Sequence, residues 1–157
     1  MTAAEVFYRE RLHAPWGLWL AVAAMALACG LVALRALPPA GVVVTVAVAF
    51  ALGAVALLAT AAPVEVTAGH LRAGRARIPL EHVGEPVALD ARTARTLRGA
   101  GFDASAYHLI RGWLPLAVRV PVTDPQDSTP YWYVATRRPE QLAVAIERAR
   151  MSRTRDG

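Results

Sequence analysis

Histidine and cysteine side chains would have to build any metal or nucleophilic site in this chain, and their spacing does not favour one. No two of the histidines His13, His70, His82 and His108 have the i, i+4 spacing with which a helix presents a zinc pair, and the only cysteine, Cys29, stands apart from them. The sequence has no lysine, no Gly-x-Ser-x-Gly elbow and no phosphate loop that ends in Gly-Lys-Ser/Thr. We therefore expect no metal, no cofactor and no enzymatic activity, unless folding assembles a catalytic group that no motif reveals.

Two groups of arginines are the candidates for binding chemistry. Arg72, Arg75 and Arg77 follow a long apolar stretch and are placed to meet anionic lipid headgroups, each contact being worth about 1 kcal/mol near a membrane surface. Arg137 and Arg138 precede a predicted C-terminal helix, where the amides of a helix start and guanidinium groups together bind an anion. Each group also has a simpler interpretation. In this interpretation, the group at Arg72 only sets the membrane topology and lies on a solvated hairpin. The pair at Arg137 lies in a solvated turn or forms a salt bridge with a nearby carboxylate.

Two long apolar stretches precede the first arginine group and must position it. Between Arg11 and Glu65 the only charged residue is Arg35, which separates the uncharged stretches 14–34 and 41–62. At about 1.5 Å per residue, a helix over the shorter stretch is roughly 31 Å long, which matches the hydrocarbon core of about 30 Å. We therefore expect two transmembrane helices that form an antiparallel hairpin around a short turn containing two prolines.

Two other interpretations of these stretches remain. A soluble protein can bury a helical hairpin in its core, but the rest of this chain is too short to wrap two such helices. A cleaved signal peptide has an apolar run of about 7–15 residues, which the first stretch exceeds. Ala26 stands where a lipoprotein cleavage site before Cys29 would have Leu, and a mature lipoprotein would not need the second stretch. An integral membrane protein is therefore the interpretation that we carry forward.

The arginines around the apolar stretches predict the orientation of the hairpin. Arg9 and Arg11 precede the first stretch, Arg35 alone lies in the connecting loop, and the first candidate group follows the second stretch. Positive charge in short flanks favours the cytoplasm, so we expect a multi-pass protein of the cell membrane with both termini cytoplasmic. Topology and contact with anionic lipid account for the net charge of +5, and we expect no nucleic acid as a partner.

The chain behind the second stretch predicts a small α+β domain. Short runs of alternating apolar and polar residues, separated by glycine and proline, predict antiparallel strands. Asp90 caps a short inserted helix over 91–98, and a final helix begins at Pro139, so we expect a curved sheet or half-barrel that this helix caps. The predicted divisions are a cytoplasmic flank, a transmembrane hairpin, a β-rich domain and a frayed polar tail, over residues 1–13, 14–62, 63–150 and 151–157.

Three segments of the chain are similar to the actinobacterial two-span membrane proteins catalogued as domain of unknown function 3093. The segments are Tyr8-Arg9-Glu10-Arg11-Leu12 with Pro15-Trp16, the run LRAGRARIPL from Leu71 to Leu80, and the run TPYWYVATRRPE from Thr129 to Glu140. This resemblance covers nearly the whole chain, and the last segment is its most specific part. It implies a membrane location and a two-part layout, and no activity. The strand order and the closing helix also resemble bacterial pleckstrin-homology-like domains.

These observations together favour a non-catalytic binding module that is anchored in the membrane. The expected partner at the cytoplasmic face is anionic lipid or another protein, and an accessory subunit of a larger membrane complex is the alternative. Small residues at i, i+4 spacing, Ala26 with Gly30 and Ala49 with Gly53, are able to pack the hairpin itself or a homo-oligomer. An enzyme with an unrecognised site remains a further alternative.

Overall fold

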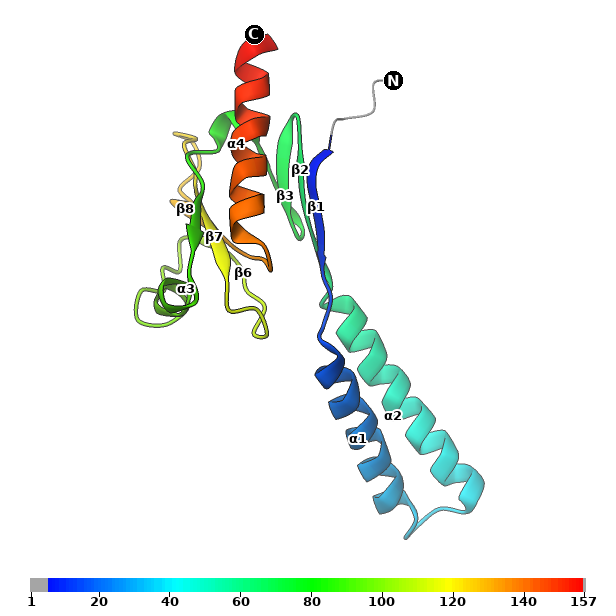
Figure 1. Cartoon of the computed structure of the whole chain (residues 1–157). Helices are drawn as coiled ribbons and strands as arrows, with labels where there is room; N and C mark the ends of the chain where they lie inside the picture. Colours follow the sequence, from blue (N-terminus) through cyan, green and yellow to red (C-terminus); the bar gives the residue numbers. More distant parts are fainter. Residues whose placement is uncertain (1–5, 157) are drawn as a thin grey trace. The chain divides into compact units, whose positions relative to one another are not determined.

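The chain folds into two units, which a computed structural model describes over residues 6–156. The first unit combines the two ends of the chain, residues 1–12 and 62–157, and the second unit consists of residues 13–61 alone. The helical unit is therefore inserted into the chain of the β-rich unit (Figure 1). Residues 13–15 connect the strand that ends at Leu12 to the first helix of the inserted unit. Residues 60–61 connect the second helix of that unit to the strand that begins at Ala62.

The inserted unit is a hairpin of two apolar helices, α1 (Trp16–Ala33) and α2 (Pro39–Ala59). Pro15 and Pro38 have extended backbones and directly precede the two helices, and Pro39 occupies the first turn of α2, where a missing N–H costs no hydrogen bond. The 18-residue stretches that identify α1 and α2 as apolar have mean hydropathies of 2.0 and 2.7, and both helices could cross a membrane by length and composition. The predicted stretches 14–34 and 41–62 therefore form two long helices, with ends shifted by a few residues.

Glycines bring the two helices close together. A Cβ atom added at Gly30 would lie 2.5 Å from Cγ2 of Val46, and one added at Gly53 would lie 2.5 Å from Cγ1 of Val22. Real Cβ atoms do not approach a methyl group that closely, so the missing side chain is what permits this packing. Both glycines belong to the small pairs seen in the sequence, and the contacts that the structure gives them lie within the hairpin.

The first sheet of the β-rich unit has four antiparallel strands in the order β1-β2-β3-β4. Their bounds are β1 (Val6–Leu12), β2 (Ala62–Thr67), β3 (His70–Ala73) and β4 (Ala76–Pro79). The expectation that residues 1–13 form a flank outside the domain is wrong for their described part, because β1 pairs with β2 from Val6 to Leu12. Ala62, predicted to end the second span, is instead the first residue of β2.

The second sheet has the order β5-β7-β8-β6. Its strands are β5 (Val87–Leu89), β6 (Tyr107–Leu109), β7 (Ala117–Pro121) and β8 (Tyr131–Ala135). The predicted antiparallel pairing of β7 with β8 is confirmed, but β6 pairs with β8 in parallel. The domain therefore holds two sheets rather than one curved antiparallel sheet, because β6 reaches β8 by a crossover instead of a hairpin turn.

Three helical segments complete the β-rich unit: the short 3-10 helix η1 (Leu80–His82), α3 (Ala91–Arg98) and α4 (Pro139–Asp156). The inserted helix is confirmed, since Oδ1 of Asp90 accepts a hydrogen bond of 2.8 Å from the Thr93 amide and Gly99 follows the last helical residue. The frayed tail expected over 151–157 is wrong for its described part, because α4 continues to Asp156. An ion pair between Arg153 and Glu81 ties this last part of α4 to η1.

Helix α4 joins the two sheets into one core. It packs against β1 and β2 of the first sheet and against β5 and β7 of the second. Its Leu142 and Ile146 are fully buried, together with Val64 from the first sheet and Tyr133 from the second. The hydroxyl of Tyr107 on β6 also donates a hydrogen bond of 2.8 Å to a carbonyl oxygen of the first sheet. These contacts fix the relative position of the sheets that carry the sites described below.

Candidate functional site

Arginines line the outer face of the first sheet. In the strand register Arg9 on β1 is paired with Glu65 on β2, Glu65 with Arg72 on β3, and Arg72 with Arg77 on β4. Residues paired across an antiparallel sheet project from the same face, so these four side chains form one row across all four strands. The neighbouring residues Val64, Leu71 and Ile78 are buried, which places the row on the face opposite the core.

Two further arginines extend this row at one end of the sheet. Arg11 lies two residues beyond Arg9 on β1 and therefore shares its face. Arg75 lies in the turn between β3 and β4, next to Gly74, whose φ of 65° suits a residue without a side chain. The Gly74 amide donates a hydrogen bond of 2.8 Å to the carbonyl oxygen of Pro63, which is the register partner of Arg11. Both arginines thus lie at the end of the sheet where the chain leaves for the helical unit and returns from it.

We call these residues the arginine face: Arg9, Arg11, Arg72, Arg75 and Arg77. Four of them are exposed and Arg72 is half-buried, with its Nε donating to the carbonyl oxygen of Gly74 at 3.2 Å. Glu65 is the one carboxylate in the row, so five arginines against one glutamate leave four net positive charges. Guanidinium groups present planar pairs of donors that fit the oxygens of a phosphate. The arrangement therefore suits phosphate groups or other oxyanions.

The structure brings together the first predicted arginine group and adds two members to it. Arg72, Arg75 and Arg77 lie on one hairpin, as their spacing indicated. Arg9 and Arg11 were predicted only as topology signals, because the segment that carries them was not recognised as a strand. The available signal was weak: Arg9 and Arg11 are two residues apart and would share one face of a strand, but the charged Glu10 between them interrupts the apolar–polar alternation.

The second predicted arginine group lies elsewhere, at the junction of β8 and α4. Arg137 and Arg138 are both exposed and directly precede the first residue of α4. The Arg137 amide donates to Oε1 of Glu10 at 3.2 Å, and Nη1 of Arg137 lies 3.5 Å from the carbonyl oxygen of Arg11. The protein's own carboxylate thus accepts from the Arg137 amide at the helix start. Binding of an external anion by this pair stays a prediction.

Glu10 connects residues from the two ends of the chain. Its Oε2 accepts hydrogen bonds from the Thr136 hydroxyl at 2.6 Å and from the Tyr8 hydroxyl at 2.8 Å. Thr136 is fully buried, and its Oγ1 also accepts from the Arg138 amide at 3.1 Å. Burial, the hydrogen bond to Glu10 and the charge of that carboxylate raise the pKa of Tyr8 to about 12, although the Thr136 hydroxyl acts in the opposite direction. Such a network holds the half-buried Glu10 side chain in place and gives the junction a structural role.

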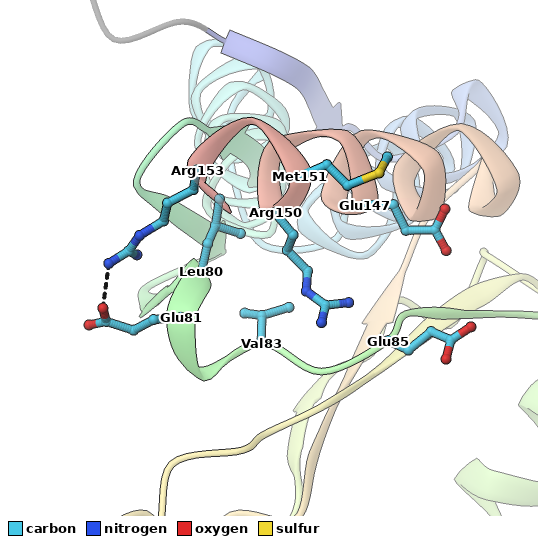
Figure 2. Close-up of a pocket in the computed structure, with 8 residues that line it drawn as sticks. All are labelled: Leu80, Glu81, Val83, Glu85, Glu147, Arg150, Met151 and Arg153. Atoms are coloured by element: carbon cyan, nitrogen blue, oxygen red, sulfur yellow. Dashed lines mark hydrogen bonds and ion pairs between the residues drawn. The ribbon is translucent and has the colours of Figure 1, made fainter. Parts of the chain in front are cut away.

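An open groove of about 620 Å³ lies between α4 and the segment that includes η1 (Figure 2). Its walls carry charges of both signs and a few apolar side chains, contributed by Leu80, Glu81, Val83, Glu85, Glu147, Arg150, Met151 and Arg153. The ion pair between Arg153 and Glu81 crosses it, as the dashed line in Figure 2 shows. The groove therefore has no dominant charge, in contrast to the arginine face. Among the described side chains, those of residues 6–153, no three histidine, cysteine or acidic groups gather as metal ligands.

The comparison with known protein families matches this chain over most of its length. A family model described as "Protein of unknown function (DUF3093)" matches residues 7–146. This range includes β1 from its second residue on, the helical hairpin, the arginine face and the first part of α4, so the resemblance to this family is confirmed, while the actinobacterial origin stays a prediction. No curated protein and no solved structure matches the chain, and the likeness to pleckstrin-homology-like domains stays a prediction.

Proposed function

We propose, on the premise that the chain belongs to the DUF3093 family of proteins of unknown function, that it is a two-span membrane protein presenting a binding domain at the cytoplasmic face. The family itself assigns no activity, so the proposal stands on the residues of this chain. In it, α1 and α2 cross the bilayer, and the β-rich unit binds its target without catalysing a reaction.

The observation that carries this proposal is the uncovered apolar surface of the hairpin. No residue of α2 is buried, and only Ala26 and Gly30 of α1 are. Large apolar side chains such as Val32 and Leu52 are exposed to 76% and 67%. Soluble monomers rarely expose contiguous apolar patches above a few hundred Å². Hydrocarbon chains of a bilayer would cover this surface, and the helical backbone satisfies its own hydrogen bonds there.

Residues at the ends of the hairpin support the same proposal. Trp16 opens α1 and is 77% exposed, as suits an indole ring at the boundary between hydrocarbon and headgroups. Inside α2, the Thr45 hydroxyl donates to the Gly41 carbonyl oxygen at 2.9 Å, so this polar group needs no water. Arginines flank the outer ends of both helices more densely than the loop between them, which favours cytoplasmic termini.

Labelling of single cysteines in intact cells tests this topology. The native Cys29 is first replaced by Ala, and one new cysteine is introduced at Ala36 between the helices or at Gly112 in the domain. Gly112 is exposed and has open space where a side chain would project. We expect a membrane-impermeant maleimide to label the Ala36→Cys protein in intact cells and the Gly112→Cys protein only after permeabilisation. Equal labelling of both proteins in intact cells would contradict the proposal.

A second candidate function, an accessory subunit, has one observation in its favour. A groove of about 530 Å³ between α1 and α2 is lined almost entirely by apolar atoms, and small residues such as Ala23, Ala26 and Ala47 form part of it. Small residues let another helix approach closely within a membrane. Extraction in mild detergent would recover a companion in constant ratio if this candidate is right, and the chain alone if it is not.

A further inference from the structure

We infer that the arginine face is a binding site for anionic phospholipid headgroups of the bilayer that the hairpin crosses, an inference that rests on the proposed function. It names one ligand for the domain, a headgroup phosphate, and it assigns the site to residues of three different strands and a turn. The predicted arginine group did not contain the full set, because Arg9 and Arg11 lie before the first helix.

The described side chains, those of residues 6–153, leave the charges of this face unpaired. Among them no ion pair joins any of its five guanidinium groups to a carboxylate, although Glu65 stands between Arg9 and Arg72 in the register. By contrast, Arg153 in the groove of Figure 2 is paired with Glu81. Apart from Nε of Arg72, which donates to the Gly74 carbonyl oxygen, guanidinium groups without a carboxylate partner keep donors for an external oxyanion, so the arginine face is the better docking surface of the two.

The covalent connections of the chain keep this face within reach of the headgroups. Residues 13–15 join β1 to α1, and a three-residue linker spans at most about 10–14 Å even when extended. Residues 60–61 join α2 to β2 and are shorter still. Arg11 and Arg75 lie at the linker end of the sheet, and Arg9, Arg72 and Arg77 lie about 7 Å further along the strands. The whole arginine face therefore lies within a short stretch of chain from the two helices.

Anionic lipid fits these observations better than a soluble partner does. A pair of helices that holds the domain permanently beside a charged surface gives that surface a high effective concentration, so a weak site suffices. The site is a flat row of exposed arginines without a cavity or an aromatic platform, which suits loosely ordered headgroups. Cytoplasmic leaflets carry a negative surface potential that attracts such juxtamembrane arginines.

Spin-labelled lipids test this inference on the full-length protein in a bilayer. The chain is reconstituted in phosphatidylcholine vesicles that contain phosphatidylglycerol, and the association of spin-labelled phosphatidylglycerol is compared with that of spin-labelled phosphatidylcholine. We expect a several-fold preference for phosphatidylglycerol, of the order of fivefold per engaged arginine. The preference should vanish in 1 M salt, where the Debye length is about 3 Å.

Charge-matched variants locate the effect. We expect R72Q/R75Q/R77Q, and the milder R75Q/R77Q in which both side chains are exposed, to reduce the preference at least fivefold. The control R92Q/R95Q/R148Q removes the same charge from exposed positions on α3 and α4 and should keep the preference. Circular dichroism of each protein confirms its fold.

The possible failures are distinguishable. A wild-type protein that fails to float with the vesicles would overturn the membrane anchoring and, with it, this inference. A wild-type protein that is embedded but shows equal association of the two lipids would overturn the inference alone and leave the membrane anchoring in place. If the control variant loses as much of the preference for phosphatidylglycerol as the face variants do, the preference depends only on net charge. That result would also refute a defined site.

Discussion

At the scale of residues, Glu10 is the least expected feature of this chain. It lies on β1 with the register partner Val64, and therefore on the sheet face that is otherwise apolar. Its carboxylate is held by the Tyr8 and Thr136 hydroxyls and by the Arg137 amide, so three donors replace the water that it loses. An inward carboxylate in this position ties β1, which directly precedes the hairpin, to the start of α4.

The ionisation of Tyr8 provides a test of this network. Its pKa of about 12 lies above the ordinary value of 10, so folding favours the protonated hydroxyl. This contribution to stability is complete below pH 10 and is lost as the pH rises through 12. In Glu10→Gln the nearby negative charge is gone, and we expect the pKa of Tyr8 to fall toward 10. Absorbance at 295 nm during an alkaline titration measures the change, and Tyr8→Phe identifies the transition.

Glu65→Gln is the matched control for this titration. Glu65 carries the same charge on the neighbouring strand, but it projects from the opposite face of the sheet. We expect its replacement to leave the Tyr8 transition in place. A Tyr8 transition that is the same in Glu10→Gln and in the wild-type protein would show that the carboxylate is not coupled to the hydroxyl.

At the scale of elements, the hairpin depends on two close approaches between α1 and α2. Gly30 faces Val46 and Gly53 faces Val22, so each helix contributes one glycine and one valine. This reciprocal arrangement brings the helices together at two separate levels. If the hairpin crosses a bilayer as proposed, close packing of this kind would hold the helices together where the hydrophobic driving force between them is absent.

A single added methyl group at these glycines should loosen the hairpin. We expect Gly30→Ala or Gly53→Ala to destabilise the helix pair by about 1–3 kcal/mol, because the new Cβ overlaps a valine methyl. The control is Gly17→Ala, since no atom lies within 4 Å of the added Cβ and alanine favours the helix. Unfolding in a titration with denaturing detergent measures the difference. Equal stabilities of Gly30→Ala and Gly17→Ala would contradict the packing described here.

The elements differ in how far the sequence predicts them, for physical reasons. The long helices, α3 with its Asp90 cap, and the β7–β8 pair were predictable, because each rests on contacts between residues close in sequence. The strand β1 was not recognised, because Glu10 interrupts its alternation and its partner β2 lies beyond the whole hairpin. The parallel β6–β8 pairing likewise joins segments that no single turn connects.

The candidate site was likewise predictable only where its residues are close in sequence. Arg72, Arg75 and Arg77 were predicted together because one hairpin carries them, whereas Arg9 and Arg11 reach the face only through long-range pairing. The sequence predicted that Arg137 and Arg138 bind an anion, but it could not show which carboxylate lies beside them. Only the folded chain shows that Glu10 accepts from the amide at this position.

At the scale of the whole molecule, the hairpin is an insertion between two paired strands. Leu12 and Ala62 are partners in the register of β1 and β2, so the strands meet on either side of it. The β-rich unit has its own core, which includes residues of both sheets and α4 and none from α1 or α2. The hairpin is therefore not needed to complete that core, and we ascribe to it the task of holding the domain at a membrane.

The solution behaviour of the chain with and without its hairpin tests this account most directly. In one protein residues 13–61 are replaced by a short glycine-rich turn that joins Leu12 to Ala62, and the other is the full chain. The account predicts that the shortened protein is a folded monomer in plain buffer by light scattering and circular dichroism, and that the full chain requires detergent or lipid. A full-length chain that stays monodisperse in buffer without any detergent would contradict it.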